Sequence, residues 1–238
     1  MPMSAQADDL QIAGLARMSS VDWPGKLVAT LFCQGCPWAC PYCHNHDIID
    51  PRVPGVVPFD QVRALLGRRH GLLDGVVFSG GEALRQAALV PAMREVRDAG
   101  YAIGLHTAGP YPARLREILE ADLVDWVGLD IKALVADYPE VVGRRGGSGE
   151  KAWESLSVVQ ASGVDYEIRV TAFPAGPDAA EIGQALADRG VRVVALQKAR
   201  AQGAPAGFQA SGPSWEERFR AAALAMKEMG FERFIVRD

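Results

Sequence analysis

The sequence predicts an α/β fold in which one domain is built from parallel strand–helix units. Short apolar runs alternate along the chain with segments of helical periodicity, and this alternation is typical of parallel βαβ units. The runs are rich in β-branched residues and mostly lack polar alternation, as strands buried on both faces do. No long linker and no second regime of composition interrupts the pattern, so we expect a single domain.

Seven runs are predicted as strands, and six segments that follow the first six of them are predicted as helices. The strands are expected at residues 27–32, 76–78, 102–105, 126–129, 168–171, 191–196 and 234–236. Each helix is predicted from an apolar face spaced three or four residues apart. These faces are Val62, Leu65 and Leu66; Leu89, Met93 and Val96; Leu115, Ile118 and Leu119; Trp153, Leu156 and Val159; Ile182 and Leu186; and Trp215, Phe219, Ala222, Met226 and Met229. The last helix is expected to begin at Ser214 and to end at Gly230.

Charge and hydropathy narrow the range of partners. The 238 residues include 25 basic and 29 acidic side chains, and no long basic tract stands out, so a nucleic-acid partner is not expected. No apolar stretch approaches the ~20 residues that a membrane span requires. The first residues also lack the basic start and apolar region of an export signal. We therefore expect a cytoplasmic protein with neither a membrane nor a nucleic acid as partner.

The four cysteines are gathered in one short segment, at Cys33, Cys36, Cys40 and Cys43. Structural disulfides belong to exported proteins and close long loops, so a disulfide framework is not expected. Clustered thiols in a reducing compartment indicate metal ligands instead. Zinc remains the alternative, but its four-cysteine sites usually draw on two pairs some 15–20 residues apart. Short, nearly continuous thiolate runs favour an iron–sulfur cluster.

The spacing of the cysteines leaves two functions open. Cys36, Cys40 and Cys43 form a C-x3-C-x2-C triplet, and Cys33 is an additional thiol at the end of the first predicted strand. Four protein ligands would close a four-iron cluster and make an electron carrier. Three ligands would leave one iron open to bind a second molecule.

The triplet, with Tyr42 directly before its last cysteine, resembles the signature of the radical S-adenosylmethionine (SAM) superfamily. The resemblance implies that Cys36, Cys40 and Cys43 hold a [4Fe–4S] cluster with one open iron, which SAM chelates. It also implies reductive cleavage of SAM to a 5′-deoxyadenosyl radical. Tyr42 is then expected to lie against the adenine and the cluster, and Cys33 to be a buried, inert thiol.

A second motif follows the second predicted strand. Ser79-Gly80-Gly81-Glu82 resembles the family's GGE motif, although Ala83 stands where the family usually has proline. The resemblance implies that the backbone of Gly80 and Gly81 and the carboxylate of Glu82 engage the SAM ammonium. Glycines permit a close approach of backbone to ligand, and a carboxylate pairs with an ammonium.

The resemblance extends to the small activases of glycyl-radical enzymes, particularly those of anaerobic ribonucleoside-triphosphate reductase. It rests on residues 12–15 and 21–26, on Phe32, and on the Cys-His-Asn exit at 43–45. It implies a glycyl-radical enzyme as protein substrate and a low-potential electron donor such as flavodoxin or ferredoxin. The alternatives are a pyruvate formate-lyase-type activase, a small-molecule radical SAM enzyme or, last, an electron carrier whose cluster Cys33 closes.

Four further positions follow from the same resemblance. Thr107, Asp130, Lys132 and Arg169 are expected to line the SAM site, with Lys132 directed at the SAM carboxylate. His106 departs from the family, because these activases carry an aspartate that helps to build a cation site. His106 is expected either to bond SAM or Asp130, or to be satisfied by a neighbouring carbonyl.

Together these observations predict a partial (β/α)6 TIM-like barrel of the radical SAM type. Residues 1–26 are expected to form a lead-in segment and residues 27–238 the barrel. The cluster and SAM are expected at the carboxyl ends of the strands, where barrel enzymes place their active sites.

Overall fold

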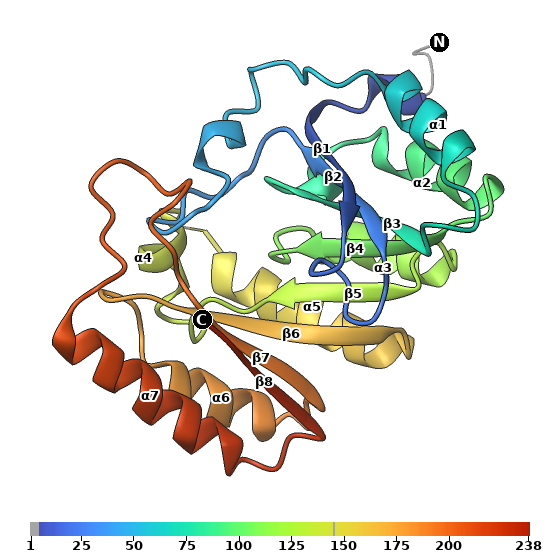
Figure 1. Ribbon diagram of the computed structural model, residues 1–238. Coiled ribbons are helices and arrows are strands. Elements are labelled where there is room, and N and C mark those ends of the chain that lie inside the picture. Colours follow the sequence, from blue (N-terminus) through green and yellow to red (C-terminus); the bar gives the residue numbers. More distant parts are fainter. Residues whose placement is uncertain (1–4, 145) are drawn as a thin grey trace.

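The computed structural model describes residues 5–144 and 146–238 and shows an open, eight-stranded sheet flanked by helices (Figure 1). Within these residues the strands are β1 (Ile12–Ser19), β2 (Val28–Cys33), β3 (Gly75–Gly80), β4 (Ala102–Thr107), β5 (Trp126–Asp130), β6 (Asp165–Ala172), β7 (Val193–Lys198) and β8 (Arg233–Arg237). The helices are α1 (Phe59–Arg68), α2 (Leu89–Asp98), α3 (Pro112–Glu120), α4 (Tyr138–Val142), α5 (Ser148–Ser162), α6 (Ala179–Ala187) and α7 (Pro213–Lys227).

The strands follow one another around the sheet in chain order, from β1 to β8. β1 pairs with β2 in antiparallel fashion, and every later neighbour pair from β2 to β8 is parallel. Each parallel crossover runs through a helix, which gives six strand–helix units and a final strand. This arrangement confirms the predicted partial barrel and all seven predicted strands.

β1 was not predicted as a strand and lies in the expected lead-in segment, whose residues 1–4 fall outside the described part of the chain. It is an edge strand, and most of its residues are half-buried or exposed. Its sequence therefore lacks the continuous apolar run that marks β2 to β8. The sheet consequently starts one strand earlier than the sequence indicates.

The six predicted helices are confirmed, but both boundaries of the last one differ from the prediction. This helix begins at Pro213 rather than at Ser214, and it ends at Lys227, three residues before Gly230. Proline is favoured in the first turn of a helix because its missing N–H is not needed there. The short helix α4 was not predicted. No helix within the described residues combines the length and the apolar character needed to cross a membrane.

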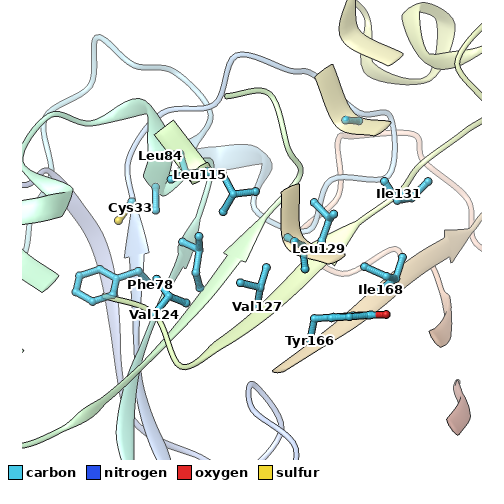
Figure 2. Packing of buried hydrophobic residues seen from close by; sticks show 14 of the residues in the cluster. Cys33, Phe78, Leu84, Leu115, Val124, Val127, Leu129, Ile131, Tyr166 and Ile168 are labelled. Atoms are coloured by element: carbon cyan, nitrogen blue, oxygen red, sulfur yellow. The ribbon is translucent and has the colours of Figure 1, made fainter. Parts of the chain in front are cut away.

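The sheet has two unlike faces. One face packs on the helices and forms the main core, to which alternate strand residues such as Phe78, Leu105 and Ile168 contribute (Figure 2). The other face lines the inside of the barrel. At its floor Trp23, Val28, Val77 and Trp126 form a separate apolar cluster, and polar side chains of the later strands lie above it. Because β2 to β8 are parallel, their carboxyl ends meet at one rim, where the candidate site lies.

Candidate active site

The cysteine loop follows β2 at this rim and is fixed by backbone hydrogen bonds. The amides of Gly35 and Cys36 donate to the carbonyls of Ile48 and Ile49, at 2.8 and 2.9 Å. The Ala39 amide donates to the carbonyl of Val142 at 3.0 Å, which ties the loop to α4. The polypeptide thus holds Cys36, Cys40 and Cys43 on a loop whose two ends are anchored.

The three thiols of the triplet are free and largely buried. Burial raises the pKa of Cys36 to about 12 and also raises the pKa values of Cys40 and Cys43. The protein alone therefore favours thiols, and metal binding would supply the positive charge that stabilises thiolates. Within residues 5–144 and 146–238 no three His, Cys, Asp or Glu side chains converge as ligands of a single ion. A four-iron cluster binds each thiolate at a separate iron.

Cys33 belongs to a strand rather than to the cysteine loop. It ends β2, is fully buried, and belongs to the core between the sheet and the helices (Figure 2). Burial, reinforced by the nearby Glu82 carboxylate, raises the pKa of its thiol to about 12. A thiol in such surroundings behaves as a small apolar side chain.

The two glycines after β3 fit against the cysteine loop. Gly80 has a φ of +111°, which favours glycine, and a Cβ there would collide with the backbone of Cys33. A Cβ on Gly81 would collide with the carbonyl of Gly35. The amides of Gly81 and Glu82 donate to the carbonyls of Cys33 and Gly35, both at 2.9 Å. The glycines therefore let this motif and the cysteine loop lie in direct contact.

Glu82 is buried and connects the ends of β3 and β4. Its carboxylate accepts hydrogen bonds from the Leu84 amide at 3.2 Å and the Ala108 amide at 3.0 Å, and the Thr107 hydroxyl lies 2.9 Å from both of its oxygens. Burial raises the pKa of Glu82 to about 7. The carboxylate is therefore held in one orientation by two amides and a hydroxyl. Thr107, which also accepts from the Gly109 amide, reaches the site through Glu82.

Asp130 and Lys132 follow β5 on the other side of the cysteine loop. The Lys132 ammonium is buried, lies 3.2 Å from the Asp130 carboxylate and sits 5.6 Å from the ring centroid of Tyr42. Burial disfavours its charged form, but Asp130 and the adjacent groups outweigh burial and hold the pKa of Lys132 well above its usual range. The Tyr138 hydroxyl accepts from the Lys132 amide at 3.1 Å. Lys132 is therefore a fixed cation rather than a surface lysine.

Tyr42 carries an unsatisfied polar atom at this place. Its ring packs against Phe173, with centroids 4.4 Å apart, and its buried hydroxyl has no hydrogen-bond partner among the described residues. Buried hydroxyls are normally paired, and an unpaired one indicates a partner that the polypeptide does not supply. The Tyr42 hydroxyl therefore fits a bound polar ligand.

Arg169 belongs to an ion-pair network inside the barrel. Its guanidinium donates to Glu167 at 2.9 Å, and Arg237 binds both oxygens of the same carboxylate at 2.7 and 2.8 Å. Burial alone would raise the pKa of Glu167, but the two guanidinium groups outweigh it and lower that pKa. Arg169 is paired in register with Asp130, so the network adjoins the Lys132 side of the site.

The structure thus brings ten of the eleven predicted site residues to the adjoining ends of β2, β3, β4 and β5, and connects Arg169 to them through β6.

Two residues that help to form the site were not predicted. Asn45, whose side-chain amide donates to the Gly80 carbonyl at 3.0 Å, was quoted only as part of a shared motif. Tyr138 lies on α4, which had no sequence signal. His106 is satisfied by the Asp22 carbonyl, one of the two alternatives expected for it.

The fold and the site define a class: a partial-barrel enzyme with a cysteine triplet at the carboxyl rim of its strands. The model of the radical SAM superfamily matches residues 30–199, which is more than half of the chain. The chain therefore belongs to the radical SAM superfamily. It is an enzyme whose cofactors are a [4Fe–4S] cluster and SAM.

Two relatives each align with 72% of this chain, over 72% of their own length. One, from Methanocaldococcus jannaschii, is named a glycyl-radical enzyme activating enzyme and is 28% identical. The other is the pyruvate formate-lyase-activating enzyme of Clostridium pasteurianum, which is 31% identical.

Solved structures show the same fold at low sequence identity. A radical SAM methyltransferase from Sphaerobacter thermophilus aligns with a TM-score of 0.66 and 19% identity, over 90% of this chain and 67% of that one. A domain of the pyruvate-formate lyase-activating enzyme from Bacteroides vulgatus aligns with a TM-score of 0.50 and 16% identity, over 68% of this chain and 98% of that domain.

Replacing Lys132 by methionine is expected to weaken SAM binding without removing iron. The loss of a charge-assisted hydrogen bond corresponds to roughly 1.5–3 kcal/mol, or about 10- to 150-fold in Kd. The measurement is anaerobic calorimetric titration of cluster-loaded enzyme with SAM. Lys151→Met, which removes an exposed lysine of α5, is the matched control. Equal SAM affinity in Lys132→Met and wild type would show that Lys132 does not touch SAM.

Proposed function

We propose that this enzyme generates a glycyl radical on a partner enzyme, anaerobic ribonucleoside-triphosphate reductase. The observation that carries the proposal is the match to two activating enzymes over 72% of their chains and of this one. The resemblance of residues 12–15 and 21–23 to the activases of this reductase supports the choice, whereas residues 24–26 and 43–45 are shared with pyruvate formate-lyase activase. We further propose a cytoplasmic location and a flavodoxin or ferredoxin as electron donor.

Cys36, Cys40 and Cys43 would hold a [4Fe–4S] cluster and leave one of its irons without a protein ligand. The cluster would supply the reductive cleavage of SAM, and with it the radical chemistry that removes a hydrogen atom from the partner's glycine. Cys33 would stay out of the cluster, because it lies on β2 and its fully buried side chain shares a face of that strand with Ala29 and Leu31, which pack in the main core.

The remaining site residues would hold SAM. Glu82 would accept the SAM ammonium beside the backbone of Gly80 and Gly81. Thr107 would orient the Glu82 carboxylate. Lys132 would bind the SAM carboxylate. Its position is fixed by Asp130, which lies 3.2 Å away.

Two further residues complete the proposed SAM site. Tyr42 would contact the adenine, and its unpaired hydroxyl would gain a partner there. Arg169 would connect its ion-pair network with Glu167 and Arg237 to the edge of the SAM site.

The proposal is tested by mixing the reduced, cluster-loaded enzyme with SAM and the reductase under anaerobic conditions. Electron paramagnetic resonance should then detect a glycine-centred radical in the reductase, at no more than one per active site. A reductase whose acceptor glycine is replaced by alanine should give no signal. SAM cleavage without the reductase should be slow, because no hydrogen donor is held within the ~3–3.5 Å that reaction requires.

Two other substrates are distinguished by the same assay. A radical on pyruvate formate-lyase, with none on the reductase, would retain the activase chemistry and change the partner. If a protein-free metabolite fraction couples SAM cleavage to its own modification, the enzyme acts on a small molecule and the activase assignment is wrong.

A further inference from the structure

The connection between β1 and β2, residues 20–27, folds into the barrel instead of remaining outside it. Trp23 of this connection is buried and stacks on Trp126 at the start of β5, with ring centroids 5.6 Å apart and planes 18° apart. Together with Val28 and Val77 the two rings form the apolar floor of the barrel. The connection is therefore an internal part of the barrel.

Two strand glycines leave the space that this arrangement needs. A Cβ on Gly104 would lie 2.9 Å from a ring carbon of Trp23, and one on Gly128 would lie 3.0 Å from His106 and 2.9 Å from Arg169. These distances are shorter than side chains tolerate, so neither position has room for a larger residue. The interior is shaped around Trp23 and His106.

His106 of β4 holds the connection by a hydrogen bond inside the barrel. Its Nε2 lies 2.7 Å from the Asp22 carbonyl oxygen, which can only accept, so Nε2 carries the proton and donates. Nδ1 is then the acceptor for the Ser79 hydroxyl, at 3.1 Å. Burial and the nearby Arg169 lower the pKa of His106 well below its usual range, so the imidazole is neutral. The Arg169 guanidinium lies 3.1 Å from the same Nε2 and 3.5 Å from the Asp22 carbonyl oxygen. The 2.7 Å contact between Nε2 and the carbonyl oxygen requires a proton between them, so Arg169 donates to the carbonyl and not to Nε2.

The residues that contact His106 lie next to both sides of the proposed SAM site. Ser79 directly precedes Gly80 on β3, and Arg169 is paired in register with Asp130. The connection also presents Val21, whose side chain is among the most exposed of the described apolar residues, at 77%. Val21 is thus the apolar side chain that the connection offers to a partner reaching the site.

We propose that His106 is a positioning residue that holds residues 20–27 as the inner wall against which the glycine-bearing segment of the partner lies. The inference rests on the proposed function. His106 acts through the Asp22 carbonyl, and both of its ring nitrogens have protein partners, the Asp22 carbonyl and the Ser79 hydroxyl. Losing this hydrogen bond would let the connection move and would place the acceptor glycine less accurately.

The test compares His106→Leu with His106→Gln in the cluster-loaded enzyme, using the reductase as partner. The Nε2 amide of glutamine can still donate to the Asp22 carbonyl, whereas leucine cannot. In His106→Leu we expect the KM for the reductase to rise about tenfold and the glycyl radicals formed per SAM cleaved to fall about tenfold, as loss of one buried hydrogen bond allows. His106→Gln should restore both quantities to within about twofold of wild type.

Hydrogen exchange gives a readout that does not depend on the reaction. The amides of residues 20–27 should exchange about tenfold faster in His106→Leu than in wild type or His106→Gln. Wild-type coupling and exchange in His106→Leu would overturn the inference, as would an equal defect in His106→Gln or faster exchange with unchanged coupling. Absence of a radical with the wild-type enzyme would instead refute the proposed function, and the inference with it.

Discussion

Alanine at Cys36, Cys40 or Cys43 is expected to remove the cluster and to abolish SAM cleavage. Each thiol would ligate one iron, and no other cysteine follows in the chain to replace it. Iron in anaerobically reconstituted protein should fall from about four atoms per chain to nearly none, because two thiolates do not retain a four-iron cluster. The measurements are iron and sulfide content and the release of 5′-deoxyadenosine under reducing conditions.

Cys33→Ala is the matched control, since it removes a thiol only three residues before the triplet. Its side chain is buried among apolar residues on the helix side of the sheet. The variant should keep about four irons and should still cleave SAM. Loss of the cluster in Cys33→Ala would make Cys33 a fourth ligand and would revive the electron-carrier alternative.

Leucine at Glu167 is expected to give the largest loss of stability from a single residue outside the cluster. The carboxylate is fully buried and binds Arg169 and Arg237. Its removal leaves two guanidinium groups facing each other without a counter-charge, and breaking a buried pair in this way costs about 3–5 kcal/mol. Anaerobic urea unfolding of the cluster-loaded protein, followed by circular dichroism, should show a midpoint shifted to lower urea.

Glu154→Leu provides the comparison. Glu154 pairs with Arg116 at 3.4 Å, and about half of each side chain is exposed. Such pairs contribute about 0–1 kcal/mol, so the unfolding midpoint should hardly move. A double variant, Glu167→Leu with Arg169→Leu, should recover part of the lost stability because one unpaired charge is removed. Equal stability of Glu167→Leu and Glu154→Leu would contradict the network described for the barrel interior.

Those parts of the fold that depend on local pattern could be predicted from the sequence. Continuous apolar runs identified β2 to β8, because strands buried on both faces carry no polar alternation. β1 was not predicted because its half-exposed residues give no such run. The pairing of Arg169 with Glu167 could be anticipated, since residues two apart on a strand share a face. Arg237, 70 residues further on, could not be placed beside them without the tertiary structure.

The candidate site, like the fold, could be predicted from the sequence only where local motifs define it. The cysteine spacing and the SGGE motif located the site, because short motifs carry their chemistry in local sequence. The sequence left two alternatives for His106: a contact with SAM or Asp130, or a hydrogen bond to a neighbouring carbonyl. The carbonyl belongs to Asp22, 84 residues away, and it reaches His106 only because the β1–β2 connection enters the barrel. No local pattern predicts that insertion.

The proposed function requires that three cysteines hold a cluster with one open iron for SAM. Mössbauer spectroscopy of the enzyme reconstituted with iron-57 measures this arrangement, in wild type and in Cys33→Ala, before and after SAM is added. We expect SAM to change the spectrum of one iron in four, equally in both proteins. Four irons unaffected by SAM in wild type, or the absence of a cluster in Cys33→Ala, would show that the three-cysteine assignment is wrong.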